Sequence, residues 1–358
     1  MQSYNPAGTD GFDFLEFCTN DPNKLAKQFE SMGFINVAKH KSCDITIYQQ
    51  NDIRFLINVT PNSRASKFAD LHGPSVCAMG FRVHNAKAAY QYAIDKGARP
   101  YQPVDEKGVY DIPAIYGVGD SLIYFVDYTN QQPNYAPSFS TLPSPQLFHR
   151  GVDLSYIDHV THNLHRGNMI EWANFYTRLF NFREIRYFDI EGKLTGLKSK
   201  AMTSPCGKIR IPLNESSDDK SQIEEFLKDF NGEGIQHIAL GADHIYESVE
   251  SLRKRGLAFL DTPDTYYDLI EKRLPHHGEN IENLKRNRIL IDGETKTDKR
   301  LLLQIFTQNM LGPVFFEIIQ RKGDEGFGEG NFRALFESIE LDQIRRGVLK
   351  EEKEEELA

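Results

Sequence analysis

The stretch YIDHVTHNLHRGNMIEWANFYTRLFNF, residues 156–182, joins an apolar, β-branched run to a polar turn and then to a segment with helical apolar spacing. This pattern predicts a strand followed by a helix. The same order recurs in GFDFLEFCTNDPNKLAKQFESMGF (11–34), CAMGFRVHNAKAAYQYAIDKGARP (77–100) and GIQHIALGADHIYESVESLRKRGLAFL (234–260). Strand-like segments follow each helix, such as RFLINVT, SLIYFVDY, GKIRIPL and PVFFEIIQ. The chain is therefore predicted to be an α+β protein built from four β-α-β-β-β units.

The length of 358 residues, with 40% apolar and 26% charged residues, favours two globular domains. Residues 131–149, QQPNYAPSFSTLPSPQLFH, hold four prolines and three serines and predict an extended linker. The predicted domains are 1–150 and 151–358, with two units in each. Two units can close their strands into a half-open barrel with the helices outside. Alternate strand residues then point into its hollow.

Charge and cysteine content exclude several classes of protein. The formal net charge of −9 argues against nucleic acid as a partner. The four cysteines, Cys18, Cys43, Cys77 and Cys206, show no CxxC pairing, which is typical of reduced thiols in the cytoplasm. No signal peptide is visible, and no apolar run approaches the roughly 20 residues needed to cross a bilayer. We expect a cytoplasmic protein without a membrane partner.

His159 lies inside the apolar run of the third unit, where an imidazole needs a partner. One interpretation is a core histidine satisfied by a neighbour; the other is a metal ligand. The fourth unit opens with His237, 78 residues later, and Glu317 lies in the last strand-like segment, a further 80 residues on. A buried carboxylate without a partner is costly, and a metal ion removes that cost. Two histidines and a carboxylate with open positions are typical of non-haem Fe(II) oxygenases. The matched positions favour the metal interpretation.

The first domain offers an internal comparison. Its matching strand positions hold Phe14, Gly80, and Phe125 or Val126, none of which is a metal ligand. The N-terminal domain is therefore predicted to be a scaffold without metal ligands. His162 stands an odd number of residues from His159, so it is expected to face the other side of the strand.

Four strings of the second half carry a family resemblance: YIDHVTHN, GIQHIAL, LLLQIFTQ and FFEIIQRKGDEGFGEGNFRALFESIE. Together they resemble the 4-hydroxyphenylpyruvate dioxygenases of the vicinal oxygen chelate superfamily. The resemblance covers nearly the whole chain. It implies the vicinal oxygen chelate fold in both domains and a C-terminal lid helix at about 330–346. It also implies one Fe(II) per chain on His159, His237 and Glu317.

The resemblance further implies a substrate pocket of polar side chains and aromatic walls: Ser199, Asn214, Gln222, Gln236, Gln304, Phe306, Phe315, Phe327 and Phe332. The residues alone allow plainer interpretations. Asn214 is also suited to an Asx turn, the two glutamines Gln236 and Gln304 to interior amides, and Phe332 to helix packing. Gln222 follows a loop that looks short for the family.

The implied reaction converts 4-hydroxyphenylpyruvate and O2 to homogentisate and CO2, by oxidative decarboxylation, ring hydroxylation and side-chain migration, in tyrosine and phenylalanine catabolism. A homo-oligomer, dimer or tetramer, is implied as well. Hydroxymandelate synthases share the scaffold and substrate, but tend to carry a smaller aliphatic residue near Phe306. Extradiol ring-cleaving dioxygenases lack the GFGEGNF string. A metal-free binding or resistance protein of the same fold would have no reason to bury two histidines and a glutamate.

Overall fold

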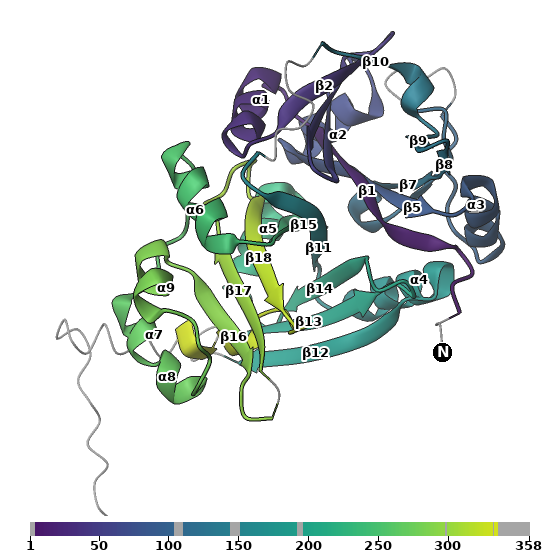
Figure 1. Ribbon diagram of the computed structural model, residues 1–358. Helices are drawn as coiled ribbons and strands as arrows, with labels where there is room; N and C mark the ends of the chain where they lie inside the picture. The colour runs from purple at the N-terminus through teal and green to yellow at the C-terminus, as the bar shows by residue number, and fades with distance from the viewer. Residues whose placement is uncertain are drawn as a thin grey trace, which may run out of the picture.

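The computed structural model describes residues 4–103, 110–143, 151–191, 196–297, 299–331 and 333–335. It contains two eight-stranded sheets, each curled into a half-barrel (Figure 1). The strand order is β10-β2-β3-β4-β1-β5-β7-β6 in the first sheet and β12-β13-β14-β11-β15-β18-β17-β16 in the second. The predicted α+β class with half-open barrels is confirmed.

The first half of the chain forms the first sheet and its helices. Its elements are β1 (Thr9–Cys18), α1 (Pro22–Ser31), β2 (Ile35–His40), β3 (Ile45–Gln50), β4 (Ile53–Asn58), α2 (Arg64–His72), β5 (Ser75–Val83), α3 (Ala86–Asp95), β6 (Ala114–Tyr116), η1 (Val118–Asp120), β7 (Leu122–Val126), β8 (Tyr128–Thr129), β9 (Gln132–Pro133), η2 (Ala136–Ser138) and β10 (Phe139–Thr141). Local sequence sets the helix starts. At α1, for example, Asp21 accepts a hydrogen bond from the Lys24 amide and Pro22 takes the first helical position.

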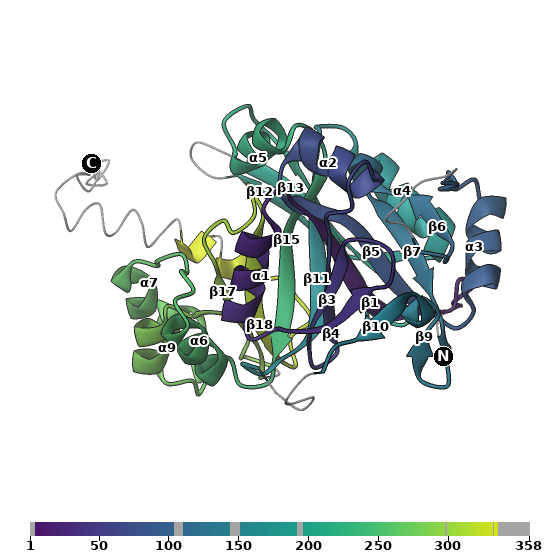
Figure 2. The ribbon, with the colours of Figure 1, turned by 90° about the horizontal axis from the view of Figure 1, so that it is seen from above.

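The second half forms the second sheet, with α6 to α9 gathered at one side (Figures 1 and 2). Its elements are β11 (Leu154–Leu164), α4 (Met169–Phe180), β12 (Arg183–Glu191), β13 (Gly196–Thr203), β14 (Arg210–Ser216), α5 (Gln222–Phe230), β15 (Gly234–Ala242), α6 (Ile245–Lys254), α7 (Asp264–Asp268), α8 (Ile270–Arg273), α9 (Ile281–Asn287), β16 (Leu290–Glu294), β17 (Arg300–Phe306) and β18 (Phe315–Lys322).

The β-α-β-β-β order holds in the units that begin with β1, β11 and β15, although α7 to α9 are inserted in the last. The unit that begins with β5 differs. Among the described residues, α3 is followed by β6, η1 and β7, and the missing strand is reduced to an isolated bridge between Pro100 and Ile115. In each sheet the first strands of the two units pair antiparallel, β1 with β5 and β11 with β15. This pairing sets the two units side by side around one hollow.

The segment predicted to be an extended linker, 131–149, is folded over its described part. β10 pairs antiparallel with the edge strand β2, and Phe139 is buried. The Tyr135 hydroxyl donates a hydrogen bond to the buried Asp13 carboxylate at 2.8 Å. The prediction of a linker is wrong here because it rested on the proline and serine content. It gave no weight to Tyr135 and Phe139, the two aromatic side chains that anchor the segment. Residues 144–150, and with them the predicted domain boundary, lie outside the described residues.

The hollow of the first sheet is filled by aromatic side chains. Phe14 contacts Tyr110, Tyr124 and Tyr135 with ring centroids 5.5–5.8 Å apart. Phe14 pairs with Gly80 across β1 and β5, and a Cβ at Gly80 would lie 2.6 Å from the phenyl ring. The first half-barrel therefore has a packed interior, as a scaffold requires.

The two halves share one core. Phe316 of β18 packs against Phe17 and Phe55 of the first sheet, with centroids 6.4 and 5.9 Å away. The first sheet thus supports the strand that carries Glu317. None of the described helices has both the length and the apolar character needed to cross a bilayer.

Candidate metal centre

Three neighbouring strands at the centre of the second sheet, β11, β15 and β18, bring His159, His237 and Glu317 together. One ligand atom from each lies within 4.8 Å of the others, and no other group of this kind occurs among the described residues. The Nε2 atoms of His159 and His237 lie 3.2 and 3.5 Å from Oε2 of Glu317. The sequence analysis groups these three residues by their matching places in the repeated units. The strand order explains why, because the three strands that carry them are neighbours in the sheet.

The group fits a divalent cation. His159 and Glu317 are each 2% exposed, and Oε1 of Glu317 is buried with no hydrogen-bond partner among the described residues. A buried anionic oxygen without a partner is costly. Imidazole nitrogen and carboxylate oxygen are suitable donors for a first-row divalent metal, and three of them leave coordination positions open.

The electrostatics of the group favour an anionic carboxylate. Burial raises the pKa of Glu317, but the two imidazoles outweigh it and hold the pKa below its ordinary value. Burial lowers the pKa of His237. For His159 burial acts in the same direction, but Glu317 and Asp158 overcome it and raise the pKa. A positive charge is therefore favoured at the point where the three side chains meet.

Three of the four predicted aromatic walls lie at this group. Phe315 stacks on His237, with centroids 4.9 Å apart and planes at 16°. Phe306 pairs with Glu317 across β17 and β18 and meets Phe315 edge-on at 6.1 Å. Phe327 lies edge-on to His159 at 5.2 Å. Phe332 lies outside the described residues, so its predicted role is not described by the structure.

The predicted polar residues are spread along the same sheet. Ser199 pairs with Asn214 across β13 and β14, and the Asn214 amide donates to Oδ1 of Asn163 on β11 at 3.5 Å. Gln304 is buried, and its Oε1 has no partner among the described residues. Gln236 places its Oε1 3.0 Å from Nδ1 of His237.

Gln222 is not brought to the group. It is exposed at the first residue of α5, a helix that packs on β11 and β14. Ser221 caps α5 by accepting a hydrogen bond from the Glu224 amide, which fixes the start of the helix immediately after a short loop. The structure thus gives no support to the predicted role of Gln222.

Several residues at the group were missed by sequence reasoning. Oγ1 of Thr161 lies 3.0 Å from Nε2 of His237, and Asn163 is fully buried beside Asn214. Both follow His159 at even spacing, so strand alternation could have indicated them. Asp158 was missed for the opposite reason: the residue next to His159 should face away in a regular strand.

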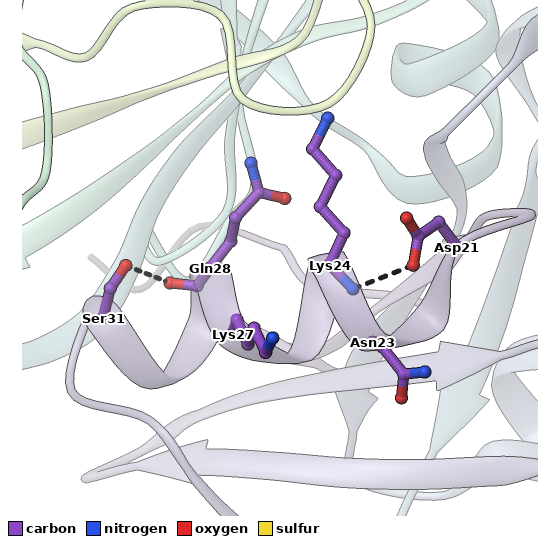
Figure 3. A pocket seen from close by; sticks show the side chains of 6 residues that line it. All are labelled: Asp21, Asn23, Lys24, Lys27, Gln28 and Ser31. Carbon is purple, nitrogen blue, oxygen red and sulfur yellow. Dashed lines mark hydrogen bonds between the residues drawn. The ribbon is translucent and has the colours of Figure 1, made fainter.

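A surface depression along α1 has no connection with this chemistry. Figure 3 shows polar side chains of one helix and its cap that point in different directions. The depression is lined by Asp21, Asn23, Lys24, Lys27, Gln28 and Ser31. They offer no convergent set of ligand atoms.

Family models match both halves of the chain. The model described as Hydroxyphenylpyruvate dioxygenase, HPPD, N-terminal, matches residues 3–140. The model of the Glyoxalase/Bleomycin resistance protein/Dioxygenase superfamily matches residues 156–269, which include most of β11 and all of β15.

Full-length relatives extend this similarity. A protein of Vibrio vulnificus named Hemolysin VllY is 57% identical over 98% of this chain and 99% of its own length. The 4-hydroxyphenylpyruvate dioxygenase of Legionella pneumophila is 56% identical, again over 98% of this chain and 99% of its own. The solved structure of a 4-hydroxymandelate synthase mutant from Streptomyces coelicolor matches with a TM-score of 0.78 and 26% identity, covering 94% of this chain and 99% of that one. The chain belongs to the 4-hydroxyphenylpyruvate dioxygenase family.

Proposed function

We propose that this protein is an Fe(II)-dependent dioxygenase that converts 4-hydroxyphenylpyruvate and O2 to homogentisate and CO2. The observation that carries the proposal is the buried group of His159, His237 and Glu317 under aromatic walls. Relatives named for this activity are similar over the whole length and support it. When bound, Fe(II) supplies the redox chemistry and the open positions for a 2-oxo acid and O2.

The chain itself supplies binding and orientation. Phe315 and Phe306 offer two perpendicular ring faces beside the ligands, suited to hold an aromatic substrate in one plane. Oε1 of Gln304 is a buried acceptor that has no partner among the described residues, and it is suited to a phenol hydroxyl. Holding the substrate ring in place beside the reacting centre is a large part of such catalysis.

The segment after β18 would exclude water. The Gly330 amide donates to Asp292 at 2.7 Å, and the Tyr266 hydroxyl donates to Oδ1 of Asn331 at 2.6 Å. Residues 329–331 and 333–335 are helical, which fits the first part of the predicted lid helix at about 330–346. The rest of that helix lies outside the described residues. A lid pinned here would close over Phe327 and the metal ligands.

Product analysis tests the proposal. We expect the purified protein, incubated with Fe(II), a reductant, air and 4-hydroxyphenylpyruvate, to form homogentisate, identified by chromatography and mass. His159→Ala should form none. 4-Hydroxymandelate as the product would instead support a hydroxymandelate synthase and contradict the role given to the bulky Phe306. No product together with no bound metal would support a metal-free binding protein.

Gly328 provides a second test. It has a φ of +75°, and a Cβ there would lie 2.6 Å from Cδ of Gln304. We expect Gly328→Ala to lower the rate of homogentisate formation by about tenfold or more, because roughly 1.4 kcal/mol of displacement energy at the reacting geometry is enough for that loss.

The matched control for Gly328→Ala is Gly256→Ala, at a φ of +88° with no atom within 4 Å of the added Cβ. Backbone strain is similar in both variants, so both should lower the unfolding temperature. Only Gly328→Ala should lower the turnover rate. Equal rates in the two variants would show that Gln304 is not part of the pocket.

Three wider features belong to the same proposal. Residues 1–150 would act as scaffold and 151–358 as the catalytic part. The protein would be cytoplasmic and would act as a homo-oligomer, a dimer or tetramer, which analytical ultracentrifugation tests directly.

A further inference from the structure

Asp158 lies behind the metal centre and is completely buried. The pairing of β11 with β15 shifts register between Ile157 and His159, so Asp158 sits at an irregularity of the strand. Such a bulge turns a side chain away from its regular direction. Oδ1 of Asp158 accepts a hydrogen bond from Nδ1–H of His159 at 2.8 Å. When the imidazole is neutral, this bond keeps the proton on Nδ1 and leaves the lone pair on Nε2, on the side of Glu317.

Arg321 holds Asp158 from the other side. Its Nε donates to Oδ2 at 2.7 Å and its Nη2 to Oδ1 at 2.8 Å, a bidentate pair. The carboxylate is therefore fixed in position by Arg321 on one side and by His159 on the other.

The same guanidinium also holds the segment that follows β18. Nη1 of Arg321 donates to the carbonyl oxygens of Asp324 and Gly326, at 3.0 and 2.7 Å. Its Cζ atom lies over the Phe327 ring, 5.6 Å from the centroid. Arg210 makes a second connection between Asp158 and this segment, because it lies 3.7 Å from Asp158 and 2.5 Å from Glu325. One buried carboxylate thus connects residues 324–327 with a metal ligand.

We propose that Asp158 and Arg321 are positioning residues, which set the orientation of His159 toward the metal and couple it to the position of residues 324–328. The inference rests on the proposed metal function. Hydrogen-bonded groups behind a ligating histidine typically contribute about 10- to 100-fold to metal affinity. The guanidinium contacts extend this effect to the segment that covers the site.

Asp158→Asn separates the two sides of the carboxylate. An amide has one oxygen, so it cannot accept from Nε and Nη2 of Arg321 and from His159 together. If the NH2 group of the introduced amide faces His159, Nδ1 of the imidazole must accept a hydrogen bond from it. The imidazole proton then moves to Nε2, where it blocks metal binding. We expect affinity for Fe(II), measured by anaerobic calorimetric titration of the metal-free protein, to fall by about 10- to 100-fold.

The first sheet provides a matched control. Asp13 precedes Phe14 on β1 as Asp158 precedes His159 on β11, and it is equally buried. It accepts from Tyr135 at 2.8 Å and lies 3.6 Å from both Arg54 and Arg82. Asp13→Asn should lower the unfolding temperature as a buried network loses a charge, while Fe(II) affinity stays within about threefold of wild type, less than 1 kcal/mol.

Arg321→Lys tests the coupling between His159 and residues 324–328. It also provides a second test of the inference if Asp158→Asn does not fold. A lysine keeps the charge but cannot make the bidentate pair and reach two carbonyls as well. We expect faster hydrogen–deuterium exchange at residues 324–328 and a loss of Fe(II) affinity in the same variant. Wild-type Fe(II) affinity in Asp158→Asn or in Arg321→Lys would overturn the inference and leave the proposed function intact. A wild-type protein that binds no Fe(II) would overturn the proposed function itself.

Discussion

Replacing Glu317 with glutamine is expected to lower homogentisate formation by at least about 10³-fold, because a metal ion contributes several kcal/mol to such chemistry and each 1.4 kcal/mol is tenfold. Glutamine has nearly the same shape as glutamate but carries no negative charge to balance two imidazoles and a cation. Glu317 is only 2% exposed, so solvent cannot compensate for the loss of its negative charge. Metal content should fall together with activity, as measured by metal analysis after desalting.

Glu16→Gln is the matched control for Glu317→Gln. Glu16 is a buried glutamate of the first sheet, and burial raises its pKa. It accepts hydrogen bonds from Asn58 at 3.1 Å and from Cys77 at 3.3 Å. Because Glu16 belongs to no group of clustered metal-ligand atoms among the described residues, we expect Glu16→Gln to retain metal and turnover. Loss of metal in this variant would contradict the scaffold role of the first sheet.

His162 should make the fold sensitive to acid. It is fully buried on the outer face of β11 near Tyr176 of α4, as alternation predicted, and its Nδ1–H donates to the Val160 carbonyl at 3.2 Å. Burial lowers the pKa of His162 to about 3. In the unfolded chain the ordinary pKa is about 6.5.

The sign of the effect follows from these two pKa values. Below about pH 6.5, His162 is protonated in the unfolded chain but stays neutral in the folded chain. The free energy of unfolding therefore falls as the pH is lowered to about 3. The full shift corresponds to a loss of about 5 kcal/mol. Denaturant unfolding between pH 4 and 8 should show a clearly flatter profile for His162→Gln than for wild type. Identical profiles for wild type and His162→Gln would contradict the prediction.

Much of the fold could be predicted because each unit repeats a local signal. Apolar alternation, an Asx-type turn and helical spacing together mark the strand and helix of a unit. The sequence does not show how a strand is used at a sheet edge. The chain around Phe139 was therefore predicted to be a linker, although it pairs with β2. The inserted helices α7 to α9 were not predicted either.

The metal group could be predicted because its three members occupy matching places in successive strands. Asp158 could not, since a one-residue bulge reverses the direction of a side chain and leaves no mark in the sequence. Arg321 is four residues beyond Glu317, and only the curl of the sheet brings it to Asp158. Gln222 was placed by resemblance alone, and a helix cap at Ser221 keeps it at the surface.

The position of the ligand-bearing strands within the sheet has a consequence for metal exchange. β11, β15 and β18 are the fourth to sixth of eight strands, and each is hydrogen-bonded on both sides. Fraying of a sheet begins at its edges and reaches central strands only near global unfolding. A bound ion would then leave through the mouth of the half-barrel, at a rate set by residues 324–331. Its residence time would report on that segment and be nearly independent of the global stability of the fold.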